Sequence, residues 1–149
     1  MEMSNANKVR DVEVKGTLNA LINDPNHQPL NAATIELRST QHVKYEFRGR
    51  TNTNDRSFIF QIFRDLEDGT HEIPSTYSEY AAVYLADHSG TTYASPNGST
   101  FYLTISGNKT RFVGNIQGHF DPIEHKAPTL NITASLDVTL SQPLFPVIK

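Results

Sequence analysis

Cysteine and tryptophan are absent from the 149-residue chain, and charged residues are scarce. Without cysteine, disulfide bonds, thiolate catalysis, Cys-ligated zinc and iron–sulfur clusters are all excluded. Charged residues make up 19% of the chain, below the roughly 25% of an average globular protein. No stretch approaches the roughly 20 apolar residues of a membrane-spanning helix, so we expect no membrane span. The length fits a single soluble domain that packing and backbone hydrogen bonds hold together.

The net charge of −3 is unevenly distributed. Residues 1–64 carry nine basic and seven acidic groups, whereas residues 65–149 carry four and nine. No run of Lys or Arg is present, so we expect no nucleic-acid partner. The first residues lack the basic and apolar regions of a secretory signal, which predicts cytoplasmic residence, or secretion if the chain is a trimmed form.

Alternation of apolar and polar residues predicts strands through most of the chain. Ser, Thr and Asn together account for 38 of 149 residues, a composition typical of strands and turns. The most apolar run, Ser57–Phe63, predicts a strand that is buried on both faces. Residues 77–86 fit helical and strand spacing, and we interpret them as a strand because their neighbours are strands. The other alternating segments are residues 12–22, 33–38, 42–48, 70–73, 101–106, 112–120 and 130–140.

Eight to ten strands and no convincing helix predict an all-β, mainly antiparallel fold. We expect a two-sheet β-sandwich in which residues 101–106 and 112–120 form a hairpin. The alternative is a small closed or partly open β-barrel, because Gly114 and Gly118 share a face with apolar residues and permit sharp coiling or close approach. The predicted organisation is a flexible segment at residues 1–10, one all-β domain at 11–141 and a tail at 142–149.

Catalytic and cofactor motifs are missing, so we expect a protein that is not an enzyme and that has no cofactor. The sequence contains no G-x-S-x-G motif and no glycine-rich phosphate loop. If the chain were an enzyme, the histidines discussed next and the acidic segment would be its candidate sites. The acidic segment contains Asp65, Glu67, Asp68 and Glu72.

The best candidate for a metal site combines His119, Asp121 and His125, with Glu124 as a further ligand. His119 and Asp121 are two residues apart on a predicted strand and therefore point to the same side. The following loop could return Glu124 and His125 toward them. No recognised metal-binding spacing such as H-E-x-x-H is present, so ordinary exposed histidines in a loop are the simpler interpretation.

Five of the six tyrosines lie within 26 residues, and they are the candidate ligand-binding residues. A tyrosine offers an apolar ring and a polar tip, which suits a wet binding surface for a glycan or a protein partner. The alternative is that these rings fill half-buried strand positions, which favour tyrosine. The lack of tryptophan counts against the glycan, because stacking platforms often use it. The five are Tyr77, Tyr80, Tyr84, Tyr93 and Tyr102.

We therefore expect a non-catalytic binding or interaction module that engages a glycan or protein partner through a tyrosine-bearing face or through loops. A second hypothesis is a β-barrel that carries a small apolar ligand. A third is a self-assembling structural component, because long strands such as residues 130–140 have edges that need covering. The predicted lining of the barrel is Phe58, Phe60, Phe112, Ile116 and Phe120.

Overall fold

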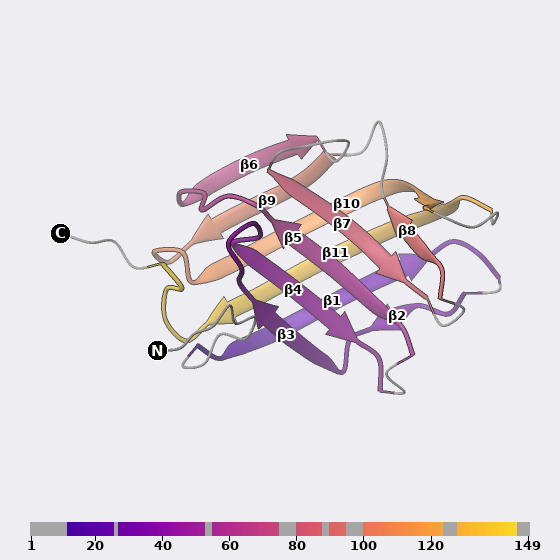
Figure 1. Cartoon of the computed structure of the whole chain (residues 1–149), viewed down its shortest axis with the longest axis horizontal. Coiled ribbons are helices and arrows are strands. Elements are labelled where there is room, and N and C mark those ends of the chain that lie inside the picture. The colour runs from indigo at the N-terminus through magenta and orange to yellow at the C-terminus, as the bar shows by residue number, and fades with distance from the viewer. Residues whose placement is uncertain are drawn as a thin grey trace.

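The structure is a computed structural model that describes residues 12–25, 27–52, 55–74, 80–87, 90–94, 100–123 and 128–145. Within these residues the chain forms eleven antiparallel strands and no helix (Figure 1). The strands are β1 (Val14–Ile22), β2 (Leu30–Asn31), β3 (Thr34–Arg38), β4 (Tyr45–Arg50), β5 (Ser57–Ile62), β6 (Gly69–Pro74), β7 (Ala81–Ala86), β8 (Thr92–Ala94), β9 (Thr100–Ser106), β10 (Arg111–Pro122) and β11 (Leu130–Leu140).

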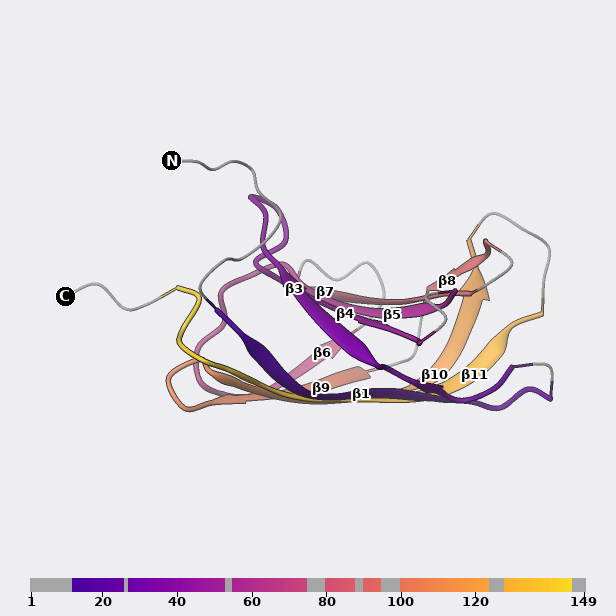
Figure 2. The same ribbon diagram turned by 90° about the horizontal axis from the view of Figure 1, so that it is seen from below.

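The strands form two facing layers (Figure 2). Layer A has the strand order β2-β1-β11-β10-β9-β6, and layer B has the order β3-β4-β5-β7-β8. The far end of β10 joins the layers on one side, because Asp121 and Pro122 pair with β8. On the other side the chain leaves β2 in layer A and enters β3 in layer B. The sheet is therefore curled into a half-barrel, which confirms the predicted all-β fold between a sandwich and a partly open barrel.

Most strand predictions are confirmed. The hairpin of β9 and β10 is formed in continuous register from Arg111↔Ser106 to Ile116↔Phe101. The first four residues of β5 are all buried, so this strand is covered on both faces as expected. The described part of residues 77–86 is a strand from Ala81 onward, and residues 75–79 lie outside the described residues.

Strand bounds shift by one to four residues in several places, and β4 and β8 show why. β4 begins at Tyr45 and not at residue 42, because the backbone N–H groups of His42 and Val43 donate hydrogen bonds to Thr40 Oγ1 at 3.3 and 3.0 Å. A side-chain turn of this kind competes with strand pairing. β8 was not predicted, since its three residues are too few to show an alternating pattern.

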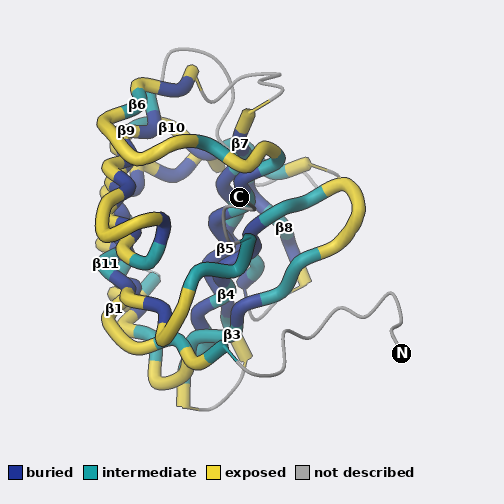
Figure 3. The backbone as a smooth tube through the Cα atoms, turned by 90° about the vertical axis from the view of Figure 1, so that its left-hand side faces the viewer, coloured by how far each residue is buried: buried dark blue, intermediate teal, exposed yellow. Residues whose placement is uncertain are grey.

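The core lies between the layers, where buried residues face each other (Figure 3). Aromatic rings from the two layers meet there: the centroids of Phe58 and Phe120 are 5.8 Å apart, and those of Phe60 and Phe101 are 5.3 Å apart. A Cβ atom added to Gly114 would lie 2.6 Å from Phe101 Cε1, so this glycine permits close approach, as predicted. Within the predicted tail, Leu144 and Phe145 pack against the core.

Candidate functional site

The outward side of layer A is a broad flat surface that we call the open face. It consists of the outward residues of β1, β11, β10, β9 and β6, and no other described strand covers it (Figure 2). One row of cross-strand partners crosses all five strands. Directly paired residues of antiparallel strands have side chains on the same face, so these five side chains are neighbours. The row is Asn19, Ser135, Asn115, Tyr102 and Glu72.

A second row of partners runs beside the first. With about 4.8 Å between neighbouring strands, each row extends about 19 Å across the sheet. The side chain of Tyr102 lies within the first row and is 46% exposed, so its ring is available to a ligand. The second row is Thr17, Asp137, Val113, Thr104 and Thr70.

Hydroxyl and amide groups dominate the open face, and its charges are few. The guanidinium of Arg111 donates to both carboxylate oxygens of Asp137 at 3.2 Å, so these two charges offset each other. The hydroxyls of Thr70 and Thr104 lie 3.3 Å apart and share a hydrogen bond. Glu72 belongs to the edge strand β6. The surface can therefore exchange neutral hydrogen bonds with a ligand and presents no concentrated charge.

The structure places three of the predicted tyrosines in three different surroundings. Tyr102 belongs to the open face. Tyr84 pairs with Ile59 and Ala94 and lies half-buried on the outward side of layer B. Tyr93 is only 3% exposed and faces the core, since it pairs with the buried Leu85. These three rings therefore do not form one binding surface.

Of the remaining two tyrosines, the structure describes one. Tyr80 precedes β7, and the guanidinium of Arg64 lies over its ring, 5.4 Å from the centroid. Tyr77 lies outside the described residues. Proximity in sequence does not bring Tyr84, Tyr93 and Tyr102 together, because alternation and the change of layer separate their side chains.

The residues of the predicted metal site are only partly described. His119 is exposed on β10 and pairs with Asn131. Asp121 accepts a hydrogen bond of 2.6 Å from Thr129 Oγ1. His125 and Glu124 lie outside the described residues. Among the residues with described positions, no group of three or more His, Asp or Glu side chains could hold a metal ion.

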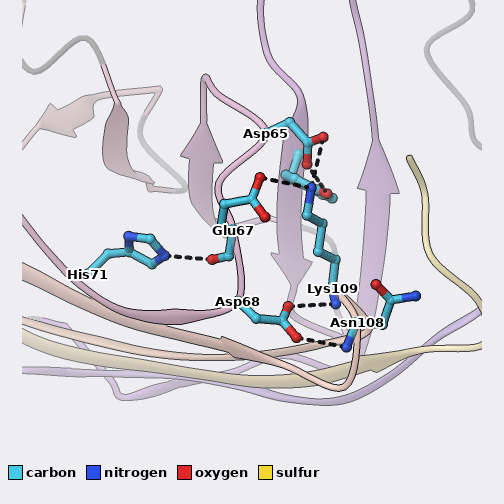
Figure 4. Close-up of polar contacts among 7 residues, drawn as sticks. Asp65, Glu67, Asp68, His71, Asn108 and Lys109 are labelled. Atoms are coloured by element: carbon cyan, nitrogen blue, oxygen red, sulfur yellow. Dashed lines mark hydrogen bonds and ion pairs between the residues drawn. The ribbon is translucent and has the colours of Figure 1, made fainter. Parts of the chain in front are cut away.

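A buried lysine organises the acidic segment at one end of the molecule (Figure 4). The Lys109 ammonium lies 3.2 Å from Asp65 Oδ2 and 3.9 Å from Glu67 Oε2, and its side chain is 10% exposed. The fully buried Tyr45 donates its hydroxyl to Asp65 Oδ1 at 3.0 Å. Burial raises the pKa of Tyr45, and the hydrogen bond to Asp65 and the negative charge of that carboxylate raise it further.

Asp68 fastens the turn between β9 and β10 to the loop before β6. Its carboxylate accepts hydrogen bonds from the backbone N–H groups of Asn108 at 2.9 Å and Lys109 at 2.8 Å (Figure 4). These two residues have left-handed φ values of 59° and 62°, which cost energy in residues other than glycine. Asp65 and Asp68 therefore stabilise a strained turn. The sequence predicted a hairpin of residues 101–106 and 112–120 but gave no sign of the acidic partners of its turn.

A histidine between two carboxylates joins the layers at β7. His27 Nδ1 lies 3.4 Å from Asp24 Oδ1, and its Nε2 lies 3.4 Å from Asp87 Oδ2. The ring of Tyr93 meets the His27 ring edge-on at 6.3 Å. Burial raises the pKa of Tyr93, and the charges of Asp87 and Asp24 add to this effect. No local sequence pattern predicts this cluster, because His27 and Asp87 are 60 residues apart.

Comparison of the chain with protein-family models, curated proteins and solved structures gives no match. In the part of the chain that the structure describes, no helix is long and apolar enough to span a membrane.

Proposed function

We propose that the protein is a non-catalytic module that binds an uncharged glycan on the open face of layer A. The observation that carries the proposal is the row of Asn19, Ser135, Asn115, Tyr102 and Glu72, which crosses five strands of a layer that no other described strand covers.

The chemistry of this row suits a sugar. A tyrosine ring can stack against the apolar C–H face of a pyranose while its hydroxyl stays in water. The amide of Asn115 and the hydroxyl of Ser135 lie beside that ring and can donate to and accept from sugar hydroxyls. Because the charges of Arg111 and Asp137 are paired, the surface favours a neutral ligand over a charged one.

The packing of the interior favours surface binding over ligand carriage. The rings expected to line a carrier cavity contact one another across the core, as Phe58 and Phe120 do at 5.8 Å. Phe101 fills the space beside Gly114. Binding on the open face, which is already exposed, does not require an internal cavity.

A glycan array followed by calorimetry tests the proposal. The purified chain is applied to an array of neutral and acidic oligosaccharides, and calorimetry then measures the dissociation constant for the best neutral ligand. We expect saturable binding that Tyr102→Ala weakens about tenfold, since loss of the stacked ring removes about 1.5 kcal/mol. Asn115→Ala should weaken binding by a smaller factor.

Tyr84→Ala is the matched control, because it removes a tyrosine from the outward side of layer B and should leave the affinity unchanged. Circular dichroism verifies that each variant folds. Failure to bind any neutral oligosaccharide would contradict the proposal, as would binding that Tyr102→Ala and Asn115→Ala both leave intact. Self-association that Tyr102→Ala abolishes, without glycan binding, would instead assign the open face to a protein interface.

A further inference from the structure

A pocket of about 190 Å³ lies on the outward side of layer B, at the corner between β3 and β4. Arg38 pairs with Glu46 and shares a face with it, while the neighbouring Leu37 and Phe47 are buried in the core. The pocket therefore lies on the opposite side of the molecule from the open face. Its lining residues are Arg38, Thr40, Val43, Glu46 and Arg48.

A tight turn forms one wall of this pocket. Thr40 N donates to the carbonyl of Val43 at 2.8 Å, while Thr40 Oγ1 accepts the backbone N–H of Val43 at 3.0 Å. The backbone N–H of His42 also donates to Thr40 Oγ1, at 3.3 Å. These three bonds hold the wall in place without a ligand.

The two arginines of the pocket lack hydrogen bonds to the described residues. Arg48 Nε is buried and has no hydrogen-bond partner, and its one ion pair is with Glu46 Oε2 at 3.5 Å. Arg38 makes one ion pair, with Glu36 Oε1 at 3.7 Å. A guanidinium carries five N–H donors, and buried donors in folded proteins are nearly always bonded. Arg48 Nε is therefore a buried donor that the described residues leave unused.

Arginines elsewhere on the surface differ in this respect. Arg50 donates to Glu36, Arg56 to the backbone carbonyls of Gln28 and Pro29, and Arg111 to Asp137.

Glu46 offsets only part of the positive charge of the two arginines, although its Oε2 lies 3.5 Å from Arg48 Nε. Its Oε1 accepts a hydrogen bond of 2.9 Å from Gln61 Nε2 on β5, so this carboxylate is held partly toward the neighbouring strand. The outward side of β3 and β4 carries three arginines against two glutamates, an excess of one positive charge in a chain of net charge −3.

We propose that this pocket binds a small oxyanion group, a carboxylate or a phosphate, between the guanidinium groups of Arg38 and Arg48. The planar fork of arginine matches two oxygens of either group and forms short, charge-assisted hydrogen bonds. The volume accommodates the anionic group and a few attached atoms. This site is independent of the glycan site proposed above.

Calorimetry with inorganic phosphate and with acetate, at constant ionic strength, tests the site. We expect saturable binding of at least one anion, weakened about tenfold or more by Arg48→Gln and by Arg38→Gln. Arg48→Lys keeps the charge but loses the fork, so it should also weaken binding. Tighter binding of phosphate identifies a phosphate group as the ligand, and tighter binding of acetate identifies a carboxylate.

Arg50→Gln is the matched control, since it removes the same charge from the same face but lies outside the pocket. It should change the affinity less than twofold. No saturable binding of either anion at concentrations up to about 10 mM would overturn the proposal. An equal loss in Arg50→Gln would also overturn it, because charge alone would then explain the binding. If Arg48→Gln fails to fold, Arg38→Gln and Arg48→Lys decide the outcome.

Discussion

Replacing Asp65 by alanine should destabilise the protein far more than replacing its partner Lys109 by methionine. Asp65→Ala leaves the Lys109 ammonium, 10% exposed, facing only Glu67 Oε2 at 3.9 Å, on a side chain that is 88% exposed. A buried charge that loses its partner costs about 3–5 kcal/mol. The fully buried Tyr45 also loses the acceptor of its hydroxyl, which adds about 1–3 kcal/mol.

Solvent lowers the sum of these two costs. The Asp65 side chain is 33% exposed, so water can enter the space that alanine leaves and solvate the ammonium in part. We therefore expect Asp65→Ala to reduce the free energy of unfolding by about 4 kcal/mol. For a domain of this size, that loss lowers Tm by about 10 °C.

Lys109→Met should change the free energy of unfolding by no more than about 1 kcal/mol, because a buried ion pair is often no more stable than a hydrophobic side chain of similar volume. Asp65 keeps its contact with solvent and with Tyr45 in this variant. Lysine and methionine are equally strained at the left-handed φ of position 109, so backbone strain cancels in the comparison. The double variant, Asp65→Ala with Lys109→Met, leaves no buried charge without a partner. It should therefore be more stable than Asp65→Ala alone.

Urea unfolding measures these differences by linear extrapolation. Far-ultraviolet circular dichroism is the suitable signal, since the chain has no tryptophan. The reasoning is refuted if Lys109→Met costs as much as Asp65→Ala, or if the double variant is no more stable than Asp65→Ala.

Three further outcomes are expected. Asp68→Ala removes the acceptor of two backbone N–H groups and should cost about 2 kcal/mol in urea unfolding, whereas Glu72→Ala on the open face should stay within about 0.5 kcal/mol. Burial raises the pKa of Tyr45 above 10.0 in the folded state. The stability that its neutral hydroxyl contributes is therefore fully present below about pH 10, and above that pH it falls by up to about 1.4 kcal/mol per pH unit. Urea midpoints between about pH 8 and 11 should fall less steeply in Tyr45→Phe. Gly16→Ala should cost at least about 2 kcal/mol more than Gly69→Ala. Both glycines have positive φ, but an added Cβ at Gly16 would lie 2.0 Å from the backbone oxygen of Asp137, whereas nothing lies within 4 Å at Gly69. Equal losses in thermal unfolding would contradict this explanation.

The regular strands could be predicted because alternation is a local property. In β11, every second residue from Leu130 to Leu140 faces the core, and the sequence pattern shows this directly. The position of Gly114 on the inward face was predictable for the same reason. The fold class followed from these strands and from the turn residues between them.

The polar clusters could not be predicted, because their members are distant in sequence. Lys109 and Asp65 are 44 residues apart, and His27 and Asp87 are 60 apart. Which loops meet is decided by strand order, and no local pattern encodes that order. The tyrosines show that nearness in sequence does not predict nearness in space, since Tyr84, Tyr93 and Tyr102 do not share one surface.

The alternation that builds the core also sorts the remaining residues into two chemically different faces. In layer B it turns Leu37 and Phe47 inward and leaves Arg38 and Arg48 outward. In layer A it leaves mainly hydroxyl and amide side chains outward, with Tyr102 among them. A neutral face and a cationic pocket thus lie on opposite sides of the core, with no shared side chain. Substitutions at distant sites act independently, so Tyr102→Ala should leave anion binding unchanged and Arg48→Gln should leave glycan binding unchanged.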